Sequence, residues 1–245
     1  MRLTATRSSI TSSGGGAVLD TITQEDPSID LNFSESKALL DDVTGSNPVS
    51  FTRASSGTFV DADGLIKSAA TNTPRFDHDP VTGASLGLLI EEARTNQVVA
   101  LNLTSGVTGS TLSEDSSVSN PDGTTGAIKI TATSGSSVHA IQRTSGQTTT
   151  NHTFSVFVKK GNHRYIGFSQ GGTGNNIYLV FDTDTKTIIH DGAHNNATFV
   201  SSGLEEYANG WFRIHVVGFT SGAALRVFLA GSASQNGLKN WSASG

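Results

Sequence analysis

Short runs of strand-forming residues, each followed by a turn sequence, constrain the fold of this chain more than any other feature. Val, Ile, Thr and Phe recur in these runs, and 27 glycines lie among stretches of Ser and Thr, which is the make-up of strands joined by many turns. Stretches rich in Ala, Leu, Glu and Lys with a helical repeat are missing. The sequence therefore predicts an all-β protein.

Alternation of apolar and polar residues predicts which side of a strand is buried. Phe154, Val156 and Val158 fall on one side of their run, and Phe157 falls on the other. In the run 211–219 the buried side is expected to carry Phe212, Ile214 and Val216. The opposite side of that run is a candidate binding surface with Trp211, Arg213, His215 and Val217.

Three parts can be distinguished along the chain. Residues 1–28 hold a triple glycine and few apolar side chains, so we interpret them as an extended arm that stays without fixed structure or orders against a neighbouring subunit. Residues 29–105 form a smaller β-rich segment, and residues 106–245 form an antiparallel β-sandwich. Strands are expected at 29–33, 49–53, 57–60, 86–91, 127–132, 138–142, 153–159, 165–169, 177–182, 187–191, 197–201, 211–219 and 224–230.

Charge and composition exclude several classes of function. The net charge is -5 and no basic block occurs, so we expect no nucleic-acid partner. No apolar run approaches the ~20 residues that span a bilayer, and no apolar signal-peptide core is visible, so membrane insertion is not expected. The absence of cysteine excludes disulfides, thiolate catalysis and Cys-ligated zinc.

Two acidic motifs are interpreted as turns. Asp61-x-Asp63-Gly64 resembles the start of a calcium loop, but the residues after it supply no further ligands. Glycine at positive φ and aspartates bonded to nearby amides explain it better. The segment 77–80, Asp-His-Asp-Pro, alternates sides if extended and is followed by a turn sequence. We expect no metal and no other cofactor.

No arrangement of catalytic residues is found. The adjacent pairs Glu91–Glu92 and Glu205–Glu206 would point to opposite sides of a strand, whereas glycoside hydrolysis needs two carboxylates facing one sugar. His190 and His194 could meet on a helix, but the residues between them indicate a loop. The sequence therefore predicts that the chain is not an enzyme.

The segment 51–96 contains the sequence motifs RASS, DADGLI, PRFDHDPVTG and LLIEEARTN. It resembles a block found in bacteriophage tail-fibre and head-spike-fibre proteins. The resemblance implies a structural component of the virion, assembled in the host cytoplasm and held by other virion proteins. It also implies a homotrimer, with residues 1–28 as the anchor to the particle.

The second half is similar to a carbohydrate-binding-module-like jelly roll. The similarity rests on NPDGTT at 120–125, FSVFVKKGNHRYIGFSQ, YLVFDTDTKTII and NGWFRIHVVGF, which follow one another in the expected order. Relatives usually continue into a further aromatic strand, whereas this chain stops at Gly245. Two explanations are left open, a longer natural product and a sheet edge completed by another chain.

The carbohydrate-binding resemblance implies a host-surface glycan as ligand. Such a ligand needs aromatic faces and amides, and the loop 171–176 is a flexible polar connection where such residues commonly lie. Packing into the sandwich competes with ligand contact for Trp211. The alternatives are a tailspike-like polysaccharide depolymerase and a plain carbohydrate-binding module. The candidate glycan contacts are Tyr165, Tyr178, Trp211, Asn175 and Asn176, with Trp241, Asn195 and Asn196 as further residues of the right type.

Overall fold

The computed structural model describes residues 2–5, 29–93, 96, 108–144, 150–171, 175–220, 222, 224–231 and 241–243. Within these residues the only helix is a short 3-10 turn, η1 (Ala208–Gly210), and all strand pairs are antiparallel. The predicted all-β class is confirmed. No helix in the described ranges has the length and apolar character needed to cross a membrane.

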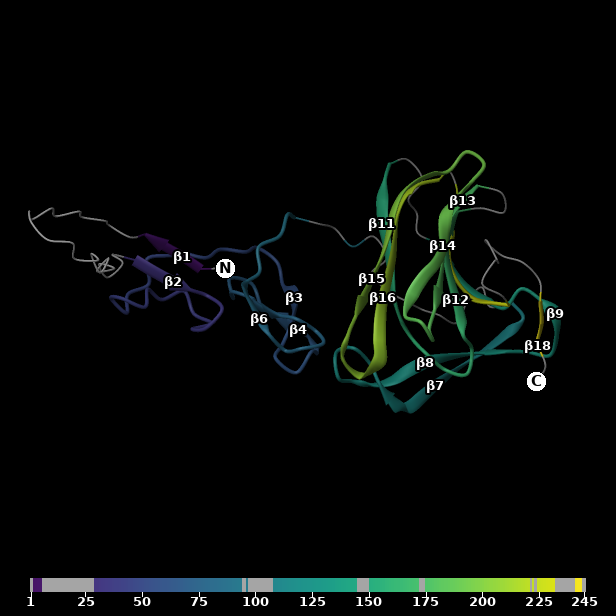
Figure 1. The fold of residues 1–245 in the computed structure, drawn as a ribbon, viewed down its shortest axis with the longest axis horizontal. Helices are drawn as coiled ribbons and strands as arrows, with labels where there is room; N and C mark the ends of the chain where they lie inside the picture. Colours follow the sequence, from purple (N-terminus) through teal and green to yellow (C-terminus); the bar gives the residue numbers. More distant parts are fainter. Residues whose placement is uncertain are drawn as a thin grey trace, which may run out of the picture. The chain divides into compact units, whose positions relative to one another are not determined.

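The chain divides into two compact units, Met1–Glu92 and Ala93–Gly245. The N-terminal unit consists of strand pairs (Figure 1). In the first pair Arg2 lies opposite Asn32, a contact that the arm interpretation did not include; residues 6–28 of the expected arm lie outside the described residues. The strands of this unit are β1 (Arg2–Ala5) with β2 (Ile29–Asn32), β3 (Gly57–Val60) with β4 (Ile66–Ala69), and β5 (Phe76–His78) with β6 (Ser85–Leu88).

Side-chain oxygens close the turns of this unit. Asp61 Oδ1 accepts hydrogen bonds from the backbone N–H groups of Asp63 and Leu65, and Gly64 adopts a φ of +76°. Asp79 Oδ1 accepts in the same way from Val81 and Thr82. The interpretation of both acidic motifs as turns is confirmed.

The strand predicted at 49–53 is wrong. Instead of joining a ladder, Arg53 is held from both sides by Asn72, whose Oδ1 accepts the Arg53 N–H at 2.9 Å and whose N–H donates to the Arg53 carbonyl at 3.0 Å. The Arg53 guanidinium also donates to the carbonyls of Ala69 and Ala70. The side chain and the backbone of Asn72 thus satisfy the Arg53 N–H and carbonyl groups that a neighbouring strand would otherwise have paired.

The C-terminal unit contains two larger sheets and two strand pairs. Figure 1 shows β11, β15 and β16 on one side of this unit and β12, β13 and β14 on the other. The five-stranded sheet has the order β10-β17-β12-β13-β14, the three-stranded sheet has the order β11-β16-β15, and the pairs are β7-β8 and β18-β9.

The chain crosses between the two larger sheets four times, from β10 to β11, from β11 to β12, from β14 to β15 and from β16 to β17. β16, the central strand of the three-stranded sheet, and β17, a strand of the five-stranded sheet, both come late in the chain. Their bounds are β7 (Ser110–Ser119), β8 (Thr125–Ala132), β9 (Gly135–Ser137), β10 (Ala140–Thr144), β11 (His152–Lys159), β12 (Tyr165–Gly171), β13 (Asn176–Asp182), β14 (Thr187–His194), β15 (Thr198–Glu206), β16 (Trp211–Phe219), β17 (Ala224–Ala230) and β18 (Trp241–Ala243).

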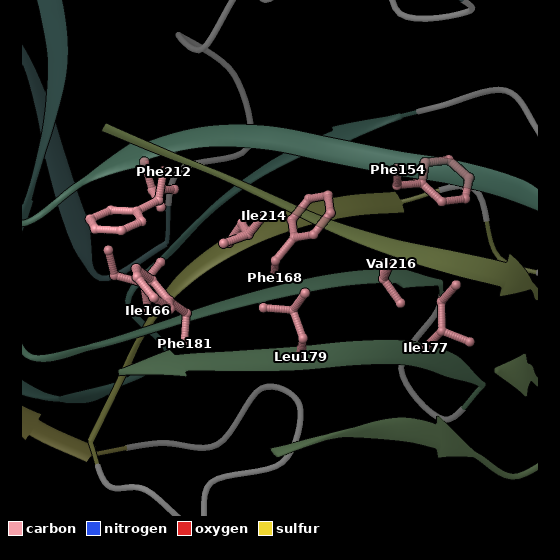
Figure 2. Packing of buried hydrophobic residues seen from close by; sticks show 10 residues of the cluster. Phe154, Ile166, Phe168, Ile177, Leu179, Phe181, Phe212, Ile214 and Val216 are labelled. Atoms are coloured by element: carbon pink, nitrogen blue, oxygen red, sulfur yellow. The ribbon is translucent and has the colours of Figure 1, made fainter. Parts of the chain in front are cut away.

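One apolar core lies between the five-stranded and three-stranded sheets, so the unit is a β-sandwich. The rings of Phe181 and Phe212 meet across it with centroids 5.0 Å apart. Figure 2 shows these side chains converging from strands of both sheets. The predicted alternation in β11 and β16 is confirmed. The buried core residues are Phe154, Val158, Ile166, Phe168, Ile177, Leu179, Phe181, Phe212, Ile214 and Val216.

Candidate functional site

The outer face of the five-stranded sheet, opposite the core, carries a set of polar side chains aligned across its strands. Because Ile166 and Phe168 of β12 point into the core, the alternate residues Gly167 and Ser169 lie on the outer face. The strand register extends this assignment across all five strands. We use the name outer face for this side of the five-stranded sheet only.

Five residues in register form a row across the outer face, which we call the polar row. Ser169 is the central member, paired with Arg226 on one side and with Tyr178 on the other. Neighbours across antiparallel strands have side chains within contact distance of each other. The polar row consists, in order, of Gln142, Arg226, Ser169, Tyr178 and Gly192.

Arg226 is held in place by two hydrogen bonds. Its Nε donates to Gln142 Oε1 at 2.7 Å and its Nη1 donates to the Gly171 carbonyl at 2.7 Å. Burial lowers the pKa of the half-buried Arg226 guanidinium, although an arginine stays charged in proteins. The two bonds fix the direction in which the free edge of the guanidinium points.

Tyr178 lies at the centre of an aromatic group with two histidines. Its ring stacks on His194 with centroids 4.8 Å apart, and His190 lies 5.4 Å away at a tilt. Gly192 separates the two histidines, and a Cβ there would approach the Tyr178 hydroxyl to 3.3 Å. Tyr178 is only 5% exposed, so the half-buried histidines are the ring surfaces that a ligand can reach.

The loop predicted between His190 and His194 is wrong. Both histidines belong to β14, which continues to His194, and Gly192 pairs with Tyr178 in the ladder. A bulge near Ile189 brings the histidines to the outer face. The period-two pattern His-x-Gly-x-His was the signal that would have placed them on one side of a strand.

The remaining amides lie at the end of β12 and β13. Asn176 lies opposite both Gly171 and His194, and its Oδ1 is buried without a hydrogen-bond partner among the described residues. Asn175 Oδ1 accepts from the backbone N–H of Asn196 at 3.4 Å. Asn176 therefore lies on the outer face beside His194, whereas Asn175 supports the connection next to it. Residues 172–174 of the predicted binding loop lie outside the described residues.

Tyr165 also lies on the outer face, at its apolar end. It packs against a second buried cluster formed by Ala140, Val180, Phe228 and Ala230. The Arg164 guanidinium lies over its ring at 5.0 Å. Tyr165 and Tyr178 are four residues apart in register, or about 13 Å along the strand, so only Tyr178 belongs to the polar row.

Trp211 is separated from the outer face by the whole sandwich. It alternates with the core residue Phe212 on β16, and its ring is 8% exposed. Its Nε1 donates to the Ser119 carbonyl at 2.7 Å, which favours packing over ligand contact. On the same side of β16, Arg213 pairs with Glu205 at 3.3 Å. The side chain of Trp241 lies outside the described part of the structure.

Three of the four glutamates in the two acidic pairs, Glu91, Glu205 and Glu206, form ion pairs. Glu205 and Glu206 both lie in β15, and Glu206 binds Lys186 at 2.5 Å. The strand predicted at 86–91 ends at Leu88, so strand alternation does not apply to Glu91, which binds Arg75 at 2.6 Å. Among the described residues, no group of three or more His, Asp or Glu side chains could hold a metal ion.

The outer face thus offers a fixed cation, the exposed amide of Gln142 and two half-buried imidazole rings, whereas the Ser169 hydroxyl is buried. This combination suits sugar hydroxyls and ring faces. Sequence reasoning identified Tyr178 and Asn176 but missed Gln142, Ser169 and Arg226, because only the strand register brings them together. No family model matches the chain, and no curated protein matches it either.

Proposed function

We propose that this chain is a structural component of a bacteriophage particle, a tail-fibre or head-fibre subunit, whose C-terminal unit binds glycans of the host surface. The observation that carries the binding part is the polar row together with His194. The sequence motifs between residues 51 and 96 support the proposal that the chain is a component of a phage particle. The jelly-roll connection, the homotrimer and the anchoring role of residues 1–28 belong to the same proposal.

Glycan binding explains why polar groups are aligned on the outer face. The row places the Gln142 amide and the Arg226 guanidinium next to one another and ends at Gly192, which lies between His190 and His194 on β14. Sugars present hydroxyls around their edge and C–H groups on their faces, so they match amides at one end and imidazole rings at the other. The row would then bind one short stretch of polysaccharide.

An array of bacterial capsular polysaccharides and lipopolysaccharides, probed with the full chain, tests this binding. His194→Ala should weaken binding about twofold to tenfold, because stacking of rings contributes about 0.5–1.5 kcal/mol. His152→Ala is the matched control, since His152 is a half-buried histidine of β11 in the three-stranded sheet. No bound glycan, or equal losses in both variants, would overturn the binding proposal.

The same incubations separate binding from depolymerisation. A binding protein leaves the polysaccharide intact, whereas a depolymerase releases new reducing ends. Turnover that a single Asp or Glu substitution abolishes would replace our proposal by the enzyme.

The virion part has its own test. Gold-labelled antibodies against the chain should decorate purified particles at the tail or on the capsid in electron micrographs. Particles that carry no label, with labelled free protein as the positive control, would contradict it.

A further inference from the structure

We infer that the ligand of the outer face is an acidic glycan, and that Arg226 binds the carboxylate of a uronic-acid residue in it. This inference rests on the proposed glycan binding and specifies the chemical class of the sugar. Arg226 has no counter-ion among the described residues.

Arg226 is a half-buried cation without an acidic partner. No carboxylate of the described residues lies within ion-pair distance of it, whereas Arg75, Arg164 and Arg213 each have one. Burial lowers its pKa, which means that the surroundings disfavour the charge without compensating for it. An anion that binds at this place would supply the missing compensation.

The free edge of the Arg226 guanidinium is oriented for a planar anion. The bonds to Gln142 and to the Gly171 carbonyl occupy Nε and one hydrogen of Nη1. The N–H groups of Nη2 and the other hydrogen of Nη1 have no acceptor among the described residues. A guanidinium presents such parallel N–H groups to the two oxygens of one carboxylate.

The charge of the surroundings has the sign that an acidic ligand needs. The chain as a whole carries a net charge of -5, yet the register places a single acidic residue, Asp182, on the outer face of the described strands. Asp182 already accepts three hydrogen bonds from Arg164. Arg226 therefore dominates the field above the polar row.

Binding of alginate and polygalacturonate fragments, which carry carboxylates, should be compared with binding of dextran, which is neutral, and of teichoic acid, which carries phosphates. We expect the uronate polymers to bind and the binding to weaken with added salt. Free glucuronate should compete with them on the unmodified chain, and free glucose should not.

Arg226→Gln should reduce uronate binding about 10- to 100-fold, because a charge-assisted hydrogen bond is lost. Arg226→Lys, which keeps the charge but loses the parallel N–H groups of the guanidinium, should show an intermediate loss of uronate binding. Lys67→Gln, which removes a cation from β4 of the N-terminal unit, is the control and should leave binding unchanged. Circular dichroism and the urea midpoint establish that each variant is folded, and the competition by glucuronate needs no variant.

The outcomes separate this inference from the function on which it rests. Binding of dextran with no effect of Arg226→Gln overturns the acidic ligand and leaves glycan binding in place. Binding of teichoic acid in preference to the uronates supports an anion site but overturns the carboxylate. Failure of all these polymers, together with every glycan of the array, overturns the proposed function itself.

Discussion

Gly167 allows a quantitative test of how the apolar end of the outer face is packed. It lies directly opposite Phe228 in the ladder between β12 and β17. A Cβ at Gly167 would lie 2.0 Å from the Cε2 and Cζ atoms of the Phe228 ring. Ordinary contact begins at 3.4 Å, so Gly167→Ala forces the ring to move by 1.4 Å, the difference between these two distances.

The Phe228 ring has no room for that movement. It is 1% exposed and packed among Ala140, Val180 and Ala230. Overpacking of a core costs about 1–3 kcal/mol, and a displacement of this size in a rigid cluster places Gly167→Ala in the upper part of that range. The φ of Gly167 is not in the positive region, so the cost arises from the contact alone.

A double-mutant cycle isolates that contact. Phe228→Ala leaves a cavity and should cost about 3–5 kcal/mol by itself. In a chain that already carries Phe228→Ala, the methyl group added by Gly167→Ala enters this cavity. Gly167→Ala should then reduce the free energy of unfolding by almost nothing. The double variant should therefore be more stable than the sum of the single effects predicts, by about the full cost of Gly167→Ala.

Urea unfolding followed by tryptophan fluorescence provides the measurement. Both tryptophans, Trp211 and Trp241, belong to the C-terminal unit, so the signal reports on that unit alone. Gly161→Ala is the matched control, because nothing lies within 4 Å of a Cβ there, and it should be neutral or stabilising by up to ~1 kcal/mol. If Phe228→Ala prevents folding, Phe228→Leu takes its place in the cycle.

Two results would refute this reasoning. One is a Gly167→Ala variant as stable as the Gly161→Ala variant. The other is additivity of the Gly167 and Phe228 substitutions within about 0.5 kcal/mol, which would mean that the ring does not occupy the space above the glycine.

Three further predictions concern stability. Hydrogen bonds from Arg164 lower the pKa of Asp182, so the stabilisation by the Asp182 carboxylate is complete above the unfolded pKa of about 4 and is lost as the pH falls below it. Asp182→Asn should therefore lower the Tm at pH 7 and reduce the fall in Tm between pH 7 and pH 3. An equal fall in Tm for the variant and the unmodified chain would contradict this. Trp211→Phe should cost about 0.5–1.5 kcal/mol in urea unfolding followed by circular dichroism, since one hydrogen bond to a backbone carbonyl is lost, and it should leave glycan binding intact. Asp77→Ala should destabilise the N-terminal unit by about 1–3 kcal/mol in limited proteolysis, because the Val60 N–H loses its acceptor, whereas Asp77→Asn should be close to neutral.

Local alternation was sufficient to predict the strands that form the core. The runs 211–219 and 224–230 coincide with β16 and β17, and the predicted inward residues Phe212, Ile214 and Val216 are buried. In these runs every second residue is large and apolar, so a shift by one residue would expose the whole set. The signal is therefore strong within a single strand.

Strands that form mainly through pairing with a neighbouring strand were not predicted from the sequence. β7 has the sequence STLSEDSSVS, which contains few residues of high β-propensity, and it forms through its pairing with β8. The strand predicted at 138–142 begins at Ala140, because His139 is drawn inward and bonds the Gly109 carbonyl.

The polar row could not be predicted for a related reason. Gln142 and Arg226 are 84 residues apart in sequence, and each looks like an ordinary surface residue in its own strand. Only the register of five strands aligns them. Tyr178 was accessible to sequence reasoning because aromatic residues are candidates wherever they occur.

The order of strands in the two sheets has a consequence for how the protein can be made. β17 lies between β10 and β12, and β16 lies between β11 and β15, so each sheet needs a strand that leaves the ribosome after both of its neighbours. Until β16 emerges, no strand lies between β11 and β15, and until β17 emerges, β10 has no link to β12, β13 and β14 of its sheet. The C-terminal unit should therefore fold late and in one step during synthesis, and nascent chains that stop before Trp211 should remain exposed to chaperones and proteases.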